Sequence, residues 1–123
     1  MNYIQSDKAP KVVGPYSQAI EANGFIFCSG QIGIDPEAGA LVEGIENQTK
    51  QVLNNLKHVL EQAGSGLENV VKSTVYLSDI SDYFKMNEIY GQYFTDHKPA
   101  RAAFAVAGLP LGALVEIEVI VVK

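Results

Sequence analysis

The chain has 123 residues, of which 47% are hydrophobic and 19% are charged, a composition that suits a globular protein and excludes a disordered one. This length predicts a single domain over residues 1–123. The net charge of −5 and the scattered lysines argue against a nucleic-acid partner, because phosphate binding needs clustered positive charge. The single cysteine, Cys28, excludes an internal disulfide and lies in an apolar run, so we expect a buried, unreactive thiol.

The N-terminal residues lack the basic segment followed by an apolar segment that marks a signal peptide. No apolar run approaches the length that a membrane span requires. We therefore expect a soluble protein of the cytoplasm that has no membrane partner.

The first third of the chain predicts short strands. Residues 2–5 predict an edge strand, and an extended segment follows at 16–20 after two proline-containing turns. The pair Asn23-Gly24 is a strong hairpin signal, with residues 25–29 as the return strand.

Two glycines, Gly30 and Gly33, continue this strand and indicate a bulge or a close backbone approach to another group. The hydrophobic period then changes to that of a helix from about residue 44 to residue 63, which Gly64 ends. β-Branched residues at 70–77 predict a further strand.

A second helix is predicted from residue 81 or 82 and ends before Pro99, with Ser81 as its N-cap. Its aromatic stripe predicts core packing, and Asn87 is the polar residue of interest in this segment. Two apolar runs, 102–107 and 113–122, then predict strands on either side of a connection rich in glycine and proline.

These elements predict an α+β fold with a single mixed β-sheet and two helices packed on one face. The last strand is apolar on both faces apart from Glu116 and Glu118, which share one face. Too few elements remain to cover the second face of the sheet. We therefore predict that subunits associate through it.

Arg101 and Glu116 are candidates for chemistry on a small acid. An arginine is a permanently charged fork that binds a carboxylate with two hydrogen bonds. A glutamate near the bound carboxylate can move a proton or hold a water molecule. The alternative is an exposed strand face with an Arg–Glu surface pair, which stabilises little. No pattern supports a metal-ligand cluster or a Ser–His or Cys–His nucleophile.

Three blocks of the sequence resemble the RidA/YjgF family, and the resemblance covers essentially the whole chain. The blocks are Gly-Pro-Tyr-Ser-Gln-Ala at 14–19, Cys-Ser-Gly-Gln-Ile-Gly at 28–33, and the C-terminal set Pro-Ala-Arg at 99–101, Gly-Leu-Pro at 108–110 and Val-Glu-Ile-Glu at 115–118. The resemblance implies a chorismate-mutase-like fold, assembled as a homotrimer with sites in the clefts between subunits. It implies no metal or cofactor.

The implied activity is that of a 2-iminobutanoate/2-iminopropanoate deaminase. Such an enzyme hydrolyses the imines that form from 2-aminoacrylate and 2-aminocrotonate, and it releases 2-oxo acids and ammonia. Two alternatives stay open. A non-catalytic module of the same fold would sense small carboxylates with Arg101 and would not need Glu116. An RNA-cleaving inhibitor of translation is an activity also attributed to relatives, but the acidic charge argues against it.

The resemblance assigns three catalytic positions. Arg101 matches the arginine that binds the substrate carboxylate, and Glu116 matches the glutamate that positions or activates water and relays protons. Tyr16 matches a tyrosine supplied by the neighbouring subunit.

Four further positions are matched to substrate binding. Ser29 and Gly30 lie in the second block, Asn87 matches an asparagine near the cleft, and Ala103 matches a position whose backbone contacts substrate or water. Many relatives carry a cysteine where this chain has Ala103. If that cysteine acts only through its backbone, little is lost, whereas any regulatory use of its thiol is absent here.

Overall fold

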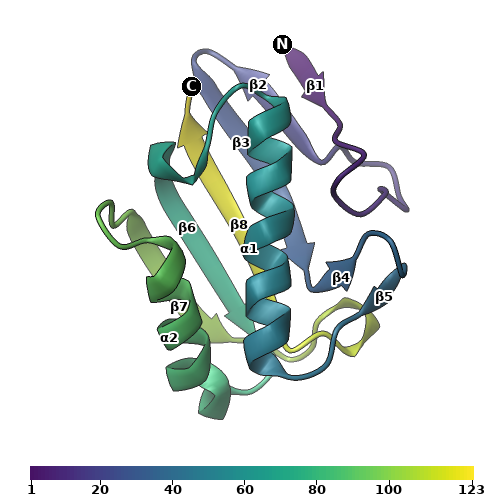
Figure 1. Cartoon of the computed structure of the whole chain (residues 1–123), viewed down its shortest axis with the longest axis vertical. Helices are drawn as coiled ribbons and strands as arrows, with labels where there is room; N and C mark the ends of the chain where they lie inside the picture. Colours follow the sequence, from purple (N-terminus) through teal and green to yellow (C-terminus); the bar gives the residue numbers. More distant parts are fainter.

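All of residues 1–123 are described by the computed structural model of the chain, which has a six-stranded sheet, a two-stranded sheet and two α-helices. The six-stranded sheet has the order β1-β2-β3-β8-β6-β7, in which only β6 and β7 are parallel. Both α-helices lie on one face of it (Figure 1). The predicted α+β class, with a mixed sheet and two helices on one face, is confirmed, but the sheet is not single, because a short hairpin of two strands, β4 and β5, forms a second sheet. The elements are β1 Asn2–Ile4, β2 Ala19–Ala22, β3 Phe25–Ile32, β4 Ile34–Asp35, β5 Ala40–Leu41, α1 Ile45–Gln62, β6 Val70–Leu77, α2 Tyr83–Tyr93, β7 Ala100–Ala105 and β8 Val115–Val122, with 3₁₀ turns η1 Leu67–Asn69, η2 Ile80–Asp82 and η3 Pro110–Gly112.

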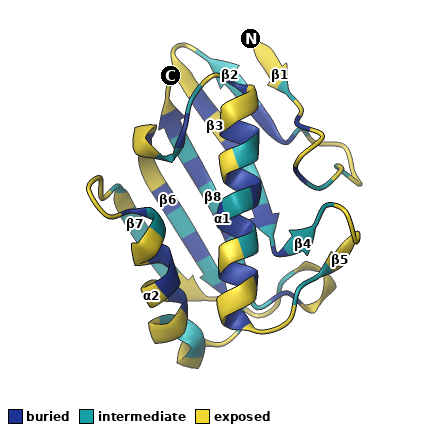
Figure 2. Cartoon of the chain, in the orientation of Figure 1, coloured by how far each residue is buried: buried dark blue, intermediate teal, exposed yellow.

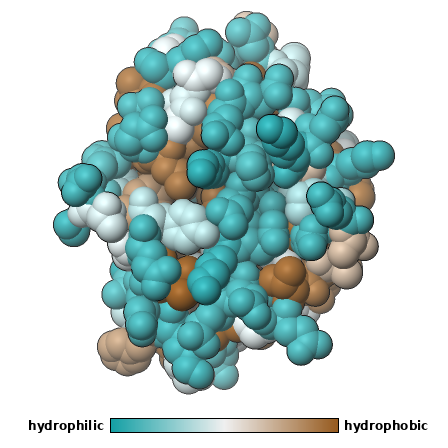
Figure 3. All heavy atoms as spheres, viewed as in Figure 1, coloured by the Kyte–Doolittle hydropathy of each residue, from teal (hydrophilic) through white to brown (hydrophobic).

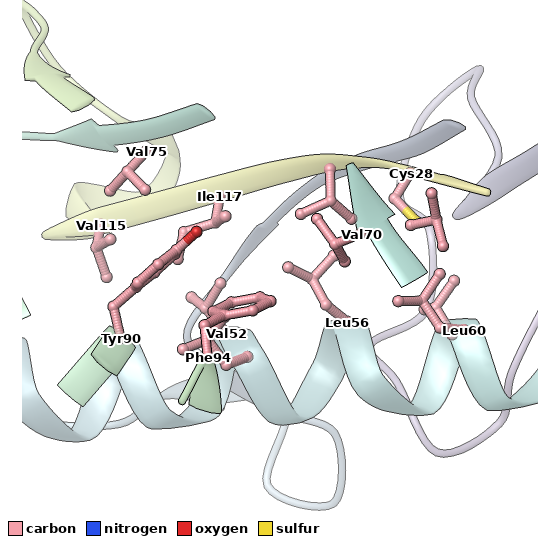
Figure 4. Packing of buried hydrophobic residues seen from close by; sticks show 14 of the residues in the cluster. Cys28, Val52, Leu56, Leu60, Val70, Val75, Tyr90, Phe94, Val115 and Ile117 are labelled. Atoms are coloured by element: carbon pink, nitrogen blue, oxygen red, sulfur yellow. The ribbon is translucent and has the colours of Figure 1, made fainter. Parts of the chain in front are cut away.

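Helix α1 packs its apolar stripe against the sheet. Val52, Leu56 and Leu60 are fully buried, and Figure 4 shows their side chains between the helix and the strands. The helix ends where the Ser65 N–H donates to the Leu60 carbonyl and the preceding residue is Gly64, at φ 77°. The predicted helix and its glycine stop are confirmed. Neither α-helix combines the length and apolar character needed to cross a bilayer.

Strand β8 lies near the middle of the sheet and has one core-facing side. Val115, Ile117, Val119 and Val121 are at most 2% exposed, and the residues between them are only half-buried. Figure 2 shows this alternation along the central strands. The predicted assignment of the two faces of this strand is confirmed.

Truncating the core is expected to destabilise the protein strongly. Leu56→Ala should lower the free energy of unfolding by about 2–5 kcal/mol, because it removes buried methyl groups and leaves a cavity. Lys57→Ala, the exposed neighbour in the same helix, should change it by about 0.5 kcal/mol or less. Urea denaturation of both variants at one protein concentration measures the difference. Equal unfolding free energies for the two variants would contradict the packing described here.

The second face of the sheet carries no helix and exposes large apolar side chains. Tyr3, Phe25, Phe27 and Phe104 are between 41% and 68% exposed, and each lies on the strand face opposite the core. The helix-bearing side is mainly hydrophilic (Figure 3). Exposed large apolar side chains on a sheet face that no helix covers are typical of an association site.

The strand predicted at 16–20 begins three residues later than the sequence indicates, at Ala19. The Tyr16 N–H donates to the Gly14 carbonyl, which closes a tight turn around Pro15, so β2 begins only at Ala19. The proline-containing turn therefore extends further than the sequence pattern indicates, and Tyr16 lies in a loop.

Ser81 is not the N-cap of α2, which begins at Tyr83. A 3₁₀ turn, η2, precedes this helix, and Asp79 caps that turn by accepting a hydrogen bond from the Ser81 N–H. An aspartate two residues before Ser81 supplies the stronger acceptor, so the cap falls on Asp79.

Candidate active site

Arg101 lies on β7, the edge strand, where it pairs with Ser73 of β6. Its Nη1 donates a 2.8 Å hydrogen bond to Asn87 Oδ1, and its Nη2 donates a 2.8 Å hydrogen bond to the Tyr83 hydroxyl. The guanidinium carbon lies 4.8 Å from the centre of the Tyr90 ring. All three partners belong to α2, so the side chain of Arg101 points to the helix-bearing side of the sheet.

These partners lie on one face of α2 because Tyr83, Asn87 and Tyr90 are spaced i, i+4 and i+7. The Tyr90 hydroxyl is 2.6 Å from Ser73 Oγ, which fixes the position of the ring. Burial raises the pKa of Tyr90, so the ring stays neutral beneath the guanidinium. The sequence pattern singles out Asn87 and assigns Tyr90 to the core, where it is buried, but it does not single out Tyr83. Their spacing relative to Asn87 is the signal that identifies them.

No carboxylate pairs with Arg101 within the chain, since the two ion pairs present involve other residues. Two of the five N–H donors of an arginine bond to α2, and three remain for a ligand. The Arg–Glu surface pair considered from the sequence is therefore absent. An oriented, unpaired guanidinium is suited to binding a small carboxylate.

Glu116 lies on the helix-free face of β8, opposite Ile32 of β3 and Tyr76 of β6. Burial and, after it, the negative charge of Glu118 raise the pKa of Glu116. The β3–β8 register shifts between Cys28 and Gln31, and this irregularity brings Gly30 against the glutamate. A Cβ atom at Gly30 would lie 2.0 Å from Glu116 Oε2, so a larger residue there would displace the glutamate side chain. The close approach predicted from this glycine is confirmed.

Ser29 of β3 forms hydrogen bonds to the loop that contains Tyr16. Its hydroxyl donates to the Ser17 carbonyl, and its N–H donates to the Gln18 carbonyl. Tyr16 itself is 53% exposed. The hydroxyl proton of Ser29 is therefore used within the chain, and it holds the segment that follows Tyr16 against β3.

The backbone of Ala103 faces outward from the edge of the sheet. The Val106 N–H donates to the Leu77 carbonyl of β6, and backbone groups alternate sides along a strand. Ala103 precedes Val106 by three residues, an odd number, so its N–H and C=O point the opposite way, away from β6. They lie on the same free edge as the backbone of Arg101.

Arg101 and Glu116 lie on opposite faces of the sheet. Arg101 contacts α2, whereas Glu116 belongs to the face that carries no helix. Strand β6 separates β7 from β8, so the connection at 106–114 does not make a hairpin of these two strands. The structure groups Arg101 with Asn87 and Ala103, and groups Glu116 with Gly30, but one chain does not bring the two groups together.

Cys28 is 6% exposed, and burial raises the pKa of its thiol to about 12. The predicted buried thiol is confirmed, and its high pKa agrees with an unreactive one. No group of three or more His, Cys, Asp or Glu side chains is arranged to hold a metal ion. Two polar hollows at the C-terminal end of α1 share Glu61 and contain none of the predicted site residues.

The family model described as Endoribonuclease L-PSP matches residues 6–123. A RutC family protein of Pyrococcus abyssi is 54% identical over 121 residues, which cover 98% of this chain and 95% of that protein. The 2-iminobutanoate/2-iminopropanoate deaminase of Mus musculus is 50% identical over 121 residues, covering 98% of this chain and 90% of that protein. The crystal structure of RidA from the Antarctic bacterium Psychrobacter sp. superimposes with a TM-score of 0.97 at 46% identity, with 100% of both chains covered.

These matches extend over nearly the whole length of the chain and of its relatives. The chain belongs to the endoribonuclease L-PSP family, which is the RidA/YjgF family. The resemblance read from the three sequence blocks is confirmed.

Proposed function

We propose that this protein is a 2-iminobutanoate/2-iminopropanoate deaminase, which hydrolyses short 2-imino acids to 2-oxo acids and ammonia. The observation that carries the proposal is Arg101, an oriented guanidinium with no carboxylate partner and with free donors beside the exposed backbone of Ala103. This is the arrangement that the carboxylate of a 2-imino acid requires. The name of the mouse relative supports the same reaction.

In the proposed reaction, Arg101 binds the substrate carboxylate and fixes the imine carbon. The substrate is attacked as the protonated imine. Glu116 takes a proton from water as the new C–O bond forms at that carbon, and the electron pair of the C=N bond moves to nitrogen, which becomes a neutral amine. Glu116 then gives this proton to the amine nitrogen, the C–N bond breaks and ammonia leaves, and the hydroxyl group passes its proton to the Glu116 carboxylate as the ketone forms. A raised pKa suits a carboxyl group that acts first as base and then as acid.

The site is proposed to be shared between subunits of a homotrimer that associates through the helix-free sheet face. Because Arg101 and Glu116 face opposite sides of one sheet, they can meet only if different protomers contribute them. Arg101, Asn87 and the Ala103 backbone would come from one protomer. Glu116 and Gly30 would come from its neighbour, together with Tyr16, whose loop Ser29 holds. Each protomer acts as one domain in this arrangement.

Mixing two impaired variants tests this sharing. In trimers assembled from Arg101→Ala and Glu116→Gln chains at equal amounts, about a quarter of the sites should combine an intact Arg101 with an intact Glu116. Activity should therefore rise on mixing, although each variant alone keeps only a residual activity. A mixture no more active than its parents, or a protein that sedimentation shows to be monomeric, would overturn the shared site.

Two other functions are weighed against this one. A binding module that senses small carboxylates would use Arg101 but would turn over no imine. A ribonuclease is the activity named in the description of the family model, but the net charge of −5 and the scattered lysines do not suit an RNA backbone. Coupling the protein to threonine dehydratase and timing 2-oxobutanoate release tests the choice. Unaccelerated release would reject the deaminase.

Removing the hydroxyl of Tyr83 is expected to weaken substrate binding. Tyr83→Phe deletes one hydrogen bond to Arg101 and keeps the ring, so KM should rise about 3- to 10-fold with kcat nearly unchanged. Tyr93→Phe is the matched control, because the Tyr93 hydroxyl bonds Asn54 instead. Steady-state kinetics of both variants measure the effect, and the same KM change in both would show that Tyr83 does not act through Arg101.

A further inference from the structure

The helix-free face holds a second carboxyl group beside Glu116. Glu118 follows two residues later on the same face of β8, so the two Cα atoms are about 7 Å apart. The hydroxyl of Tyr76, on the neighbouring strand β6, donates a hydrogen bond to Glu118 Oε1. Phe104 of β7 packs edge-on against the Tyr76 ring, with centroids 5.4 Å apart and an interplanar angle of 89°. Tyr76 is therefore fixed between two strands with its proton directed at Glu118.

The two carboxyl groups have different surroundings. Glu118 has a dedicated donor, whereas the Glu116 side chain has no hydrogen-bond donor within the chain and lies against Gly30. The bond to Glu118 raises the pKa of Tyr76 to about 12, so the hydroxyl stays a donor across the neutral range. Two nearby carboxyl groups whose environments differ in this way take different roles in proton transfer.

The other groups around Glu116 do not offset this asymmetry. Strand β3 presents Ile32 and Gly30 to it, and β6 presents Tyr76. Lys72, the charged residue on this face of β6, lies further along the strand opposite Ile120. Neither Glu116 nor Glu118 forms an ion pair in the chain.

We propose that Tyr76 and Glu118 are positioning residues for the deaminase reaction, in which the hydrogen bond from Tyr76 holds the Glu118 carboxyl group in place beside Glu116, and Glu116 carries the moving proton. This role rests on the proposed function. Glu118 touches no reacting atom in it. Its charge makes Glu116 a better proton acceptor from water, and the hydrogen bond from Tyr76 keeps the Glu118 carboxyl group from turning away.

A titration that does not depend on turnover tests the pair. In protein labelled with ¹³C at glutamate side chains, the Glu116 signal is identified by its loss in Glu116→Gln. Glu118→Gln should lower the Glu116 titration midpoint by about 0.5–1 pH unit, because it removes a negative charge two residues away on the same face of β8. Tyr76→Phe, which keeps the ring packed on Phe104, should lower the midpoint by less. Glu46→Gln, on the exposed side of α1, should leave it unmoved.

The kinetic readout separates this proposal from the one on which it depends. The acid limb of the kcat/KM profile should move to lower pH in Glu118→Gln and, by less, in Tyr76→Phe. An active wild type whose Glu116 midpoint is unchanged by Glu118→Gln would overturn the positioning role alone. A wild type that hydrolyses no imine would overturn the proposed function, and with it the role of the pair in the reaction.

Discussion

Replacing Arg101 with alanine is expected to lower kcat/KM for 2-iminobutanoate hydrolysis by about 10²- to 10⁴-fold and to leave the fold intact. Each hydrogen bond from a charged group contributes about 1.5–3 kcal/mol, so losing a two-point grip on the substrate carboxylate accounts for a loss of that size. The fold should survive because Arg101 lies on an edge strand and is only partly buried. Timing 2-oxobutanoate release from the dehydratase-coupled reaction measures the loss.

Two further variants separate charge from geometry at this position. Arg101→Lys keeps the charge but loses the planar fork, and we expect an intermediate loss of about 10- to 100-fold. Lys98→Ala removes a nearby exposed cation that bonds only the Thr95 carbonyl, so its activity should match the wild type. If Arg101→Ala keeps wild-type activity and fold, the substrate carboxylate binds elsewhere and the proposed site is wrong.

Glu116→Gln is expected to lower kcat by about 10²- to 10⁴-fold, because an amide cannot accept a proton from water. The dependence of wild-type kcat on pH should show that Glu116 acts as a base. Glu116 must be ionised to act as a base, so activity falls as the pH drops through its pKa, which burial and Glu118 raise above the usual range for glutamate. The residual activity of the variant should lack this acid limb.

Binding of the product separates an enzyme from a sensor at this position. Glu116→Gln keeps Arg101 and its partners on α2, so titration calorimetry should show 2-oxobutanoate binding within a few-fold of the wild type. Retained binding with lost turnover supports the deaminase. If turnover by Glu116→Gln equals that of the wild type, Glu116 is not the base. Lost binding would mean that Glu116 holds the ligand and not the water.

The elements that the sequence predicts well are those whose pattern is local. Helix α1 repeats its apolar residues over five turns and stops at Gly64, and β8 alternates core and outer residues without interruption. In both, the burial pattern follows from spacing within one segment. The start of β2 and the cap before α2 were missed because a loop hydrogen bond at Gly14 and the Asp79 side chain compete with the extended and helical patterns.

The candidate site is less visible in the sequence because it depends on long-range pairing. Arg101 and Glu116 are separated by a short connection, yet β6 inserts between their strands and their side chains face opposite sides. No periodicity within either strand encodes that order. The approach of Gly30 to Glu116 also depends on the irregular β3–β8 pairing. The sequence therefore predicts a close approach at Gly30, but it does not predict that the neighbouring group is Glu116.

The burial of Cys28 has a consequence for the surroundings in which the protein can work. Exchange with glutathione and oxidation to a sulfenic acid both need an accessible thiolate, and Cys28 offers none. Position 103 carries alanine, so the free edge of β7 has no thiol either. A site built from a guanidinium, a carboxyl group and backbone amides has no sulfur switch, and it should keep the same rate in reducing and in oxidising media.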